Sequence, residues 1–284
     1  MTRTALIMAG GRGDRMARSG VAEPKPLVPV AGVTLLEWNL RLLIGSGIDR
    51  VVVSVAERDA RVRQFVADRL GPIGERVGVA VDELVEEPPL GNIGPAGLLA
   101  GSVDSLLVVY ADNLTGVDLC QIYDDHLADD VDLTLAAHRE AFAMPFGELT
   151  VDVAHPDRLV AYTEKPTHVL LVSSAVMVLG PRALERAGAE VPLGISQLAQ
   201  ALVDEGGQVR LWSHDAPWVD VNDRAAIERA EALVAHHPDL FPTPDELDTI
   251  DLTRADLTRA DLTRADLTSG DLALELEPYP AVRS

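Results

Sequence analysis

The first residues in the sequence that could do chemistry lie in a short glycine-rich loop. Gly10, Gly11 and Gly13 follow an apolar run, Arg15 comes two residues later, and Lys25 stands in a Pro-Lys-Pro triplet further on. Glycines let a backbone close around phosphate oxygens, Arg can pair with phosphate through two hydrogen bonds, and Lys supplies a compact positive charge. The loop therefore predicts binding of a phosphate-rich ligand such as a nucleoside triphosphate.

Two other phosphate-binding loops are excluded by their spacing. A loop of the GxxxxGK[ST] kind has Lys directly after its last glycine, whereas Asp14 follows Gly13 here. A dinucleotide-binding loop needs a third glycine at the position of Met16, and no acidic residue ends a second strand at the expected distance. What remains is a Gly-Gly-x-Gly-x-Arg loop with a distant lysine.

The composition is that of a globular protein. The chain has 284 residues, 47% of them hydrophobic, which is enough for one substantial core or for one core with a small lobe. A formal charge of −21 argues against a nucleic-acid partner, because polyanions bind to basic surfaces. No apolar run reaches the roughly 18 residues of a membrane-spanning helix, and the N-terminus has no signal-peptide pattern. We therefore expect a cytoplasmic protein with no membrane partner.

The two lysines of the chain are distinctive, because the other 22 of its 24 basic residues are Arg. Lys25 and Lys165 each precede a proline. A chain that uses Arg almost everywhere is expected to keep Lys where a compact ammonium is needed rather than a planar guanidinium. Both positions are therefore candidates for a functional ammonium group.

Hydrophobic periodicity predicts an α/β fold. Apolar β-branched runs alternate with helical patterns, which is typical of a mostly parallel sheet with helices on both faces. From residue 132 onward, shorter strands with turns predict an antiparallel lobe inserted over the sheet. The expected strands are 4–9, 50–55, 77–82, 105–110, 132–137, 147–152, 158–163, 169–179 and 208–212, and the expected helices are 34–46, 57–69, 116–128, 181–187, 194–204 and 223–235.

Two candidate site segments meet at one edge of the predicted sheet. The glycine loop follows the strand at 4–9, and Asp112 follows the strand at 105–110. Ligands of such sheets bind beyond the carboxyl ends of the strands. We therefore expect the loop and Asp112 to line the same crevice.

Several motifs together give the chain a resemblance to a known family. The N-terminal stretch reads MAGGRGDRM…PKPLVPVAG, and it is followed in order by EEPPLGNIGPAGLLA, LLVVYADNL, MPFGELTVD, AYTEKP and PWVDVNDRAAIERAEAL. Over residues 1–236 this series resembles the sugar-1-phosphate nucleotidylyltransferases. The PPLGNIGPAG segment is closest to the form of the mannose- and heptose-type guanylyltransferases. The resemblance implies a Rossmann-like sheet with a small antiparallel sugar-binding lobe.

The resemblance also implies a nucleotidyl transfer. An oxygen of a sugar 1-phosphate attacks the α-phosphorus of a nucleoside triphosphate, and pyrophosphate leaves. Arg15 and Lys25 match the residues that hold the triphosphate and stabilise the transition state. Asp112 and Asp220 match two carboxylates that bind Mg²⁺, a hard cation suited to carboxylate and phosphate oxygens. The implied partners are a nucleoside triphosphate and a sugar 1-phosphate, and a homo-oligomer stays open.

The remaining binding positions follow from the same resemblance. The backbone of Gly10, Gly11 and Gly13 would surround the triphosphate, and Gly91 belongs to the nucleotide-binding set. Glu86 or Glu87 would accept from the amino group of guanine, which favours GTP, although either could equally be a solvated loop charge. The sugar-binding set, in which Glu164 would accept sugar hydroxyls and Lys165 would meet the sugar phosphate, consists of Gly147, Glu164 and Lys165.

The chain departs from the family pattern at several places. Ser173 and Ser174 replace a carboxamide before an apolar strand, which leaves the sugar unnamed. The usual Asp-x-Gly-Thr is replaced by Asp220-Val221-Asn222-Asp223, so Asn222 could share or take the ligand role while Asp223 caps the following helix.

A second region begins after the motif-bearing part. We expect a nucleotidyltransferase domain over residues 1–240 and a tail over 241–284. The tail repeats Ala-Asp-Leu-Thr-Arg with period five and resembles the pentapeptide repeats of β-helices. A disordered segment, a polar helix and a docked β-helical coil all stay open for it, because five repeats make little more than one coil.

Two other functions stay open besides the sugar nucleotidylyltransferase. A catalytically weak regulatory homologue could bind nucleotide and use the tail to dock on a partner. A cytidylyltransferase acting on a non-sugar phosphate would keep the fold and chemistry and change only the acceptor.

Overall fold

A computed structural model describes residues 2–11, 23–189 and 191–241 of the chain. Gly13, Arg15 and the pentapeptide repeats lie outside the described residues, so what was expected of them stays a prediction.

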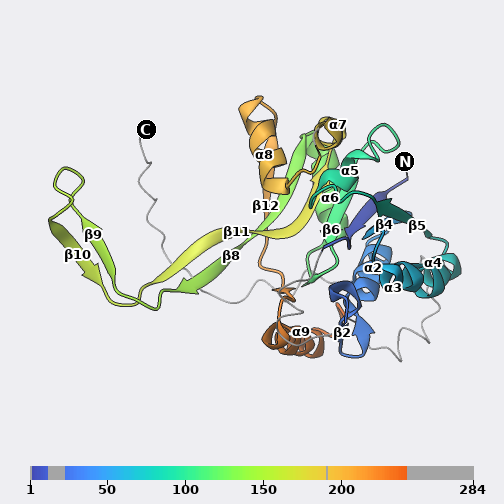
Figure 1. The fold of residues 1–284 in the computed structure, drawn as a ribbon, viewed down its shortest axis with the longest axis horizontal. Helices are drawn as coiled ribbons and strands as arrows, with labels where there is room; N and C mark the ends of the chain where they lie inside the picture. Colours follow the sequence, from blue (N-terminus) through green and yellow to red (C-terminus); the bar gives the residue numbers. More distant parts are fainter. Residues whose placement is uncertain (1, 12–22, 190, 242–284) are drawn as a thin grey trace.

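A seven-stranded sheet forms the centre of the molecule (Figure 1). All neighbouring strands pair in parallel except around β11, which runs antiparallel to β6 and to β8. The mostly parallel α/β fold predicted from the sequence is therefore confirmed. In spatial order the strands are β12 (Val209–Ser213), β8 (Leu133–Ala143), β11 (Thr167–Leu179), β6 (Leu106–Tyr110), β1 (Thr4–Met8), β4 (Arg50–Ala56) and β5 (Ala80–Glu86).

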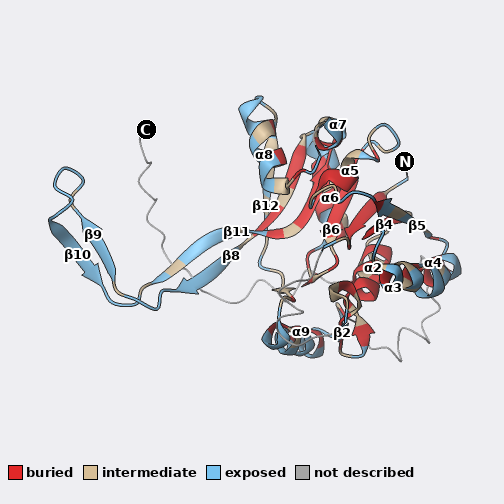
Figure 2. Ribbon diagram, in the orientation of Figure 1, coloured by how far each residue is buried: buried red, intermediate tan, exposed pale blue. Residues whose placement is uncertain are grey.

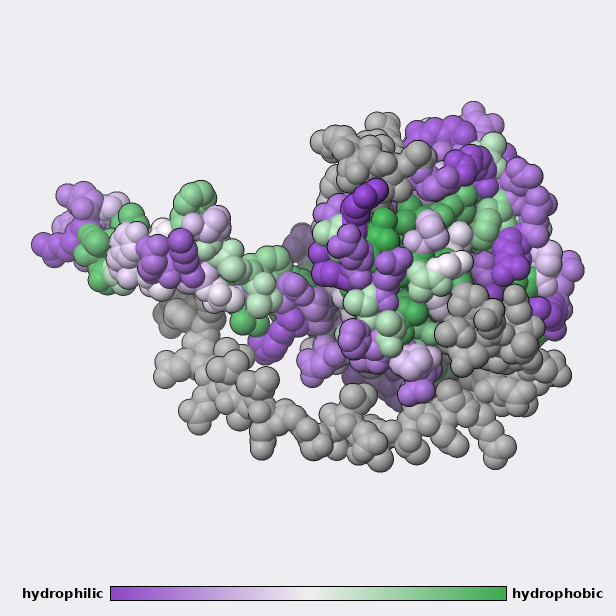
Figure 3. Space-filling view, turned by 90° about the horizontal axis from the view of Figure 1, so that it is seen from below, coloured by the Kyte–Doolittle hydropathy of each residue, from purple (hydrophilic) through white to green (hydrophobic). Residues whose placement is uncertain are grey.

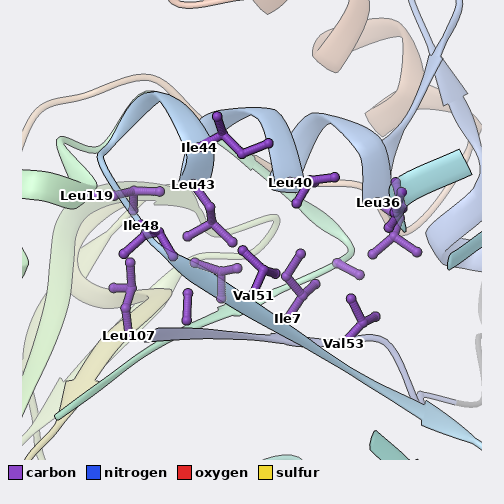
Figure 4. Packing of buried hydrophobic residues seen from close by; sticks show 14 of the residues in the cluster. Ile7, Leu36, Leu40, Leu43, Ile44, Ile48, Val51, Val53, Leu107 and Leu119 are labelled. Carbon is purple, nitrogen blue, oxygen red and sulfur yellow. The ribbon is translucent and has the colours of Figure 1, made fainter. Parts of the chain in front are cut away.

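Helices cover both faces of this sheet because its central strands are buried on both sides. On one face, apolar residues of α2, including Leu36, Leu40 and Leu43, pack on Ile7 and Val51 (Figure 4). Figure 2 shows the buried residues concentrated in this sheet and the helices against it. The helices are α2 (Leu35–Gly45), α3 (Ala60–Phe65), the π-helical turn η2 (Val66–Leu70), α4 (Gly71–Val77), α5 (Gly94–Gly97), α6 (Leu119–Asp129), α7 (Pro181–Ala189), α8 (Ile195–Asp204) and α9 (Arg224–His236).

The predicted start of one strand is wrong. The strand expected at 77–82 begins at Ala80, because α4 continues to Val77 and ends on Gly78. Gly78 has φ +73°, a left-handed backbone conformation that commonly ends a helix and suits glycine. The apolar residues before it therefore belong to the helix.

The antiparallel lobe forms an arm that projects from the body (Figure 1). Beyond the sheet, β8 and β11 continue as a two-stranded ribbon from the pair Ala137–Ser173 to the pair Ala143–Thr167. At its end a second hairpin joins β9 (Glu148–Val151) to β10 (Leu159–Thr163). The expectation that this lobe lies over the sheet is wrong, because the continuous ladder carries the strands outward.

A short hairpin and a short ribbon shape the region below the sheet. The hairpin of β2 (Pro29–Val30) and β3 (Val33–Thr34) turns at Ala31 and Gly32, both with positive φ, as a two-residue hairpin loop requires. The ribbon pairs β7 (Asn113–Thr115) with β13 (Trp218–Asp220). These strands have two or three residues each, too short for a periodic pattern to predict.

The described body includes Phe241, which lies past the predicted boundary at 240. Phe241 is fully buried, and its ring lies 5.8 Å from the ring of Trp38 in an edge-to-face contact. These rings belong to a hydrophobic cluster that α9 forms with the β2–β3 hairpin. Phe241 therefore belongs to the packed body.

Among the described residues, no helix is both long and apolar enough to cross a membrane.

The buried His126 at the end of α6 makes stability depend on pH. Its Nδ1 lies 2.9 Å from Thr134 Oγ1, and burial, with Arg210 nearby, lowers its pKa from 6.5 to about 4. Between these values the unfolded chain binds a proton that the folded chain does not, so acidification favours unfolding. We expect His126 alone to remove about 2 kcal/mol from the free energy of unfolding between pH 6.5 and pH 5.

Urea unfolding of His126→Gln at both pH values checks this prediction. The variant should lose less stability on acidification than the wild type, and His155→Gln, which alters an exposed histidine, should behave as the wild type. Equal pH dependence of His126→Gln and wild type would contradict it.

Candidate functional site

The ribbon of β7 and β13 brings two predicted metal carboxylates together. Asp220 ends β13 opposite Asn113, the residue after Asp112. The backbone of Val221 donates a hydrogen bond of 2.9 Å to the carbonyl of Asp112, which extends the ladder past both carboxylates. The helix α2 holds this ribbon in place, because the Asn39 amide donates to the carbonyl of Asn113 at 3.1 Å.

Lys25 places its ammonium between these carboxylates. Its Nζ lies 2.5 Å from Asp112 Oδ2 and 3.6 Å from Asp220 Oδ1, and the Lys25 side chain is only 13% exposed. The backbone at Lys25 is fixed by a single 3-10 turn, η1 (Lys25–Leu27), that leads into β2. Segments that lie almost 200 residues apart in the sequence thus meet at one positive charge.

Asn222 links the same groups. Its Oδ1 accepts a hydrogen bond from the Lys25 ammonium, and its Nδ2 donates to Asp220 Oδ2. Asp223 caps α9 as the sequence predicted, because its Oδ1 accepts from the backbone of Ala226 at 2.8 Å. The residues after Asp220 therefore both orient Lys25 and start the helix behind it.

The electrostatics of the site favour a cation. Burial and the negative charge of Asp112 raise the pKa of Asp220, and Lys25 and Asn222 oppose that shift. Asp220 Oδ1 is buried without a hydrogen-bond partner among the described residues. Two carboxylates that face one ammonium leave the described site with one negative charge in excess.

These donors fit a hard divalent cation. Asp112 and Asp220 supply carboxylate oxygens, the ligand type that Mg²⁺ prefers, and Asp220 Oδ1, which lies 3.6 Å from the Lys25 ammonium and accepts no hydrogen bond among the described residues, could coordinate a cation. Within the described ranges, no group of three or more His, Cys, Asp or Glu residues could hold a metal ion. A metal here would therefore also need phosphate oxygens or water, as Mg²⁺ commonly does.

The start of the glycine loop packs against the side chain of Glu86. A Cβ atom on Gly10 would collide with Glu86 Oε1, so any other residue at this position would force the Glu86 carboxylate to move. Glu86 is 5% exposed and accepts hydrogen bonds from Ser54 Oγ at 2.5 Å and from the backbone of Leu90 at 3.0 Å. These contacts connect three strand ends, whereas Glu87 is exposed. The guanine contact expected of either glutamate stays a prediction.

Gly91 has a clear packing reason to be glycine. Its φ is +89°, and an added Cβ would lie 2.6 Å from the backbone nitrogen of Leu193. The backbones of Leu90 and Leu193 are joined by a hydrogen bond of 2.9 Å. Gly91 therefore lets the segment after β5 lie directly against the segment before α8.

The predicted sugar-binding residues do not join this site. Gly147, Glu164 and Lys165 lie on the arm, which Figure 1 shows extending away from the body. The Tyr162 hydroxyl donates to Glu164 Oε2 at 3.1 Å, and the absence of a Cβ on Gly147 makes room for the Tyr162 ring. These contacts stay within the arm, so sugar binding by the three residues stays a prediction.

One polar cluster beside the site was not predicted as a unit. Ser174, at the base of the arm, has its Oγ 2.8 Å from His138 Nδ1 and 2.7 Å from His214 Nε2, and its carbonyl accepts from the Trp218 indole at 2.7 Å. Ser174 stood out in the sequence only as a departure from the family pattern, and histidines scattered over the chain carry no spacing signal. Trp218 precedes Asp220 by two residues and connects the cluster to the carboxylates.

Comparisons with known proteins identify two families in the sequence. The family described as "Nucleotidyl transferase" matches residues 4–236, and the family described as "Pentapeptide repeats (8 copies)" matches residues 247–273. A mannose-1-phosphate guanylyltransferase of Mycobacterium tuberculosis (strain ATCC 25618 / H37Rv) is 31% identical over 163 residues, which cover 57% of this chain and 44% of that protein. The chain therefore matches less than half of the length of that relative.

Two further relatives extend the comparison. A D-glycero-alpha-D-manno-heptose 1-phosphate guanylyltransferase of Aneurinibacillus thermoaerophilus is 27% identical over 167 residues, 58% of this chain and 68% of that protein. The crystal structure of HddC from Yersinia pseudotuberculosis complexed with GMP-PN has the same fold, with a TM-score of 0.62 and 20% identity over 81% of this chain and 99% of that chain. Other similar proteins are named for adenylyl or CTP transfer, so the likeness alone does not choose a base. The family match over residues 4–236 nevertheless includes nearly all of the described body, and the chain belongs to the nucleotidyl transferase family.

Proposed function

We propose that this chain transfers a nucleotidyl group from a nucleoside triphosphate to a sugar 1-phosphate and releases pyrophosphate. The observation that carries the proposal is the Lys25 ammonium held between Asp112 and Asp220. The family resemblance implies that Lys25 binds the triphosphate and that Asp112 and Asp220 bind the metal. Membership of the nucleotidyl transferase family supports the same reaction class.

In the proposed reaction, an oxygen of the sugar phosphate forms a bond to the α-phosphorus as the bond from that phosphorus to the bridging oxygen breaks. Both reactants are anions, so the protein must reduce their repulsion and align them. Lys25 is already oriented by Asp112 and Asn222, so its charge needs little reorganisation as the transition state forms. Mg²⁺ bound at Asp112 and Asp220 would supply further positive charge to the phosphates.

We further propose GTP as the donor and a hexose or heptose 1-phosphate as the acceptor. Support comes from the PPLGNIGPAG segment and from two similar proteins named as guanylyltransferases, one for mannose and one for a heptose phosphate. A structure of similar fold is complexed with GMP-PN. The assignments of GTP as the donor and of a hexose or heptose 1-phosphate as the acceptor depend on these similarities.

Pyrophosphate release tests the proposal. The purified chain with Mg²⁺ is offered ATP, GTP, CTP, UTP or dTTP, each with and without a mixture of hexose and heptose 1-phosphates. We expect release with GTP that needs the sugar phosphate. Release with another base would refute the GTP assignment, and no release with any pair by a folded protein would refute the sugar-phosphate transferase.

Replacing Lys25 should abolish turnover without unfolding the chain. We expect Lys25→Ala to lower the rate of pyrophosphate release by at least about a hundredfold, because one preorganised charge at a developing anion contributes on that order. Arg63→Ala is the matched control, since Arg63 pairs with Glu83 on the surface. Circular dichroism should show both variants folded, and a wild-type rate in Lys25→Ala would refute the role of this lysine.

Removing the tail should spare catalysis if the cut keeps Phe241. A chain ending at Phe241 should release pyrophosphate at the wild-type rate. A chain ending at His236 should melt at a lower temperature, because it loses the fully buried Phe241 ring. A folded but inactive chain ending at Phe241 would show instead that the repeats take part in catalysis.

A further inference from the structure

The arm joins the body at a base where the ladder of β8 and β11 is irregular. Figure 3 shows the arm extending from one side of the body, with hydrophobic residues along it. At its base the pairing changes register between Ser173 and Met177, and Ala175 has a positive φ of 56°. Ser174, which lies within this irregularity, is fully buried. The backbone of β11 leaves the regular ladder here, so contacts of side chains must fix it.

The Ser174 hydroxyl links two histidines from separate parts of the chain. Its Oγ lies 2.8 Å from His138 Nδ1 and 2.7 Å from His214 Nε2. One hydroxyl can donate to only one imidazole, so it must accept from the other. Glu140 Oε2 lies 3.3 Å from His138 Nε2 and favours a proton on that nitrogen. His138 Nδ1 therefore accepts from Ser174 and His214 Nε2 donates to it, and we call these three residues the Ser174 network.

The order of Glu140, His138 and Ser174 resembles the acid, histidine and serine of a catalytic triad, but burial excludes that role. A nucleophilic serine must reach its substrate. Ser174 is 0% exposed, and its hydroxyl is also engaged by His214. The hydroxyl is thus a hydrogen-bonding link and not a nucleophile.

The network fixes both ends of the segment that leads from β12 to β13. At the start of this segment, His214 bonds to Ser174 through its side chain, and its backbone donates to a carbonyl of β8 at 3.0 Å. At the end of the segment, the Trp218 indole donates to the Ser174 carbonyl at 2.7 Å. The ring centroid of Trp218 lies 4.9 Å from that of His138. Ser174 and its two histidines therefore determine where β13 begins.

The strand β13 needs such an anchor. It has three residues and lies in a two-stranded sheet with β7. A ribbon of this size is marginally stable by itself. At the end of this strand, the carboxylate of Asp220 is nevertheless held in the same site as that of Asp112, against the repulsion of like charges, with Lys25 3.6 Å from its Oδ1. The contact of Trp218 with Ser174 supplies a second anchor at the first residue of the strand.

We propose that the Ser174 network positions Asp220. The network fixes the indole of Trp218, and Trp218 begins the strand that ends at Asp220. Its members are positioning residues, because they act through Trp218 and not on a substrate. The inference rests on the proposed function only for the role of Asp220 in binding metal and phosphate.

Hydrogen exchange at the Val221 amide, followed by NMR, tests the inference without any ligand. This amide donates to the Asp112 carbonyl directly after β13, so its protection reports whether the strand stays in place. We expect His214→Leu and Trp218→Phe each to raise its exchange rate about tenfold, because each variant removes one hydrogen bond to Ser174. His214→Gln keeps a side-chain N–H that can donate to Ser174 and should exchange like the wild type.

His126→Leu is the matched control for these variants. It removes another buried histidine with a hydroxyl partner, Thr134, whose contact does not involve β13. Its Val221 amide should exchange at the wild-type rate. Wild-type exchange in both His214→Leu and Trp218→Phe, or equal acceleration in His126→Leu, would overturn the proposal.

The Mn²⁺ affinity of the same variants tests the consequence for the site. With a non-hydrolysable GTP analogue present, His214→Leu should bind Mn²⁺ at least about tenfold more weakly than the wild type, because supporting groups of a metal ligand contribute on that order. His214→Gln and His126→Leu should keep the wild-type affinity. An unchanged affinity in His214→Leu would show that the network does not position Asp220.

These outcomes separate the two proposals. If the wild type releases no pyrophosphate with any substrate pair, the proposed function fails, and exchange at Val221 still decides whether the network holds β13. If the wild type is active but the network variants change neither the Val221 exchange nor the Mn²⁺ affinity, the function stands and the positioning role is wrong.

Discussion

The described site depends on one electrostatic constraint, the close approach of two carboxylates that need a cation between them. The short ladder of β7 and β13 forces Asp112 and Asp220 toward each other. Burial and then repulsion from Asp112 raise the pKa of Asp220, and Lys25 opposes this shift from a third segment of the chain. Without the Lys25 ammonium, the neighbouring carboxylates of Asp112 and Asp220 would be energetically costly in a partly buried site. The positions of Lys25, Asn222 and the ribbon are therefore interdependent.

Much of the surrounding structure can be understood as support for this arrangement. The turn at Ala31 and Gly32 closes the hairpin that follows Lys25, Asn39 of α2 holds β7, and Asp223 starts α9 directly after Asn222. These supports come from distant parts of the sequence and pack in the cluster that Phe241 completes. Charged groups held by such contacts need little reorganisation when charge develops on a substrate, which suits catalysis by charge placement.

The sequence predicted the long elements well because their burial repeats with a regular period. It predicted that the strands before the glycine loop and before Asp112 end at the same edge of the sheet, and β1 and β6 do pair in parallel. It missed β7 and β13, since three residues carry no period, and with them the way in which Asp220 reaches Lys25. The sequence pattern also could not predict the direction of the arm. Alternation of polar and apolar residues specifies which side chains share a face. It does not specify where a ribbon points after it leaves the sheet. The burial of Glu86 depends on Gly10 and Ser54, which are distant in sequence.

The most direct test of the central claim is a titration of Mn²⁺ into the chain in the presence of a non-hydrolysable GTP analogue, followed by the electron paramagnetic resonance of the free ion. The wild type should bind Mn²⁺, and Asp220→Asn, folded as judged by circular dichroism, should lose this binding. Unchanged Mn²⁺ affinity in Asp220→Asn would contradict the assignment of the Asp112–Asp220 pair as the metal and phosphate centre.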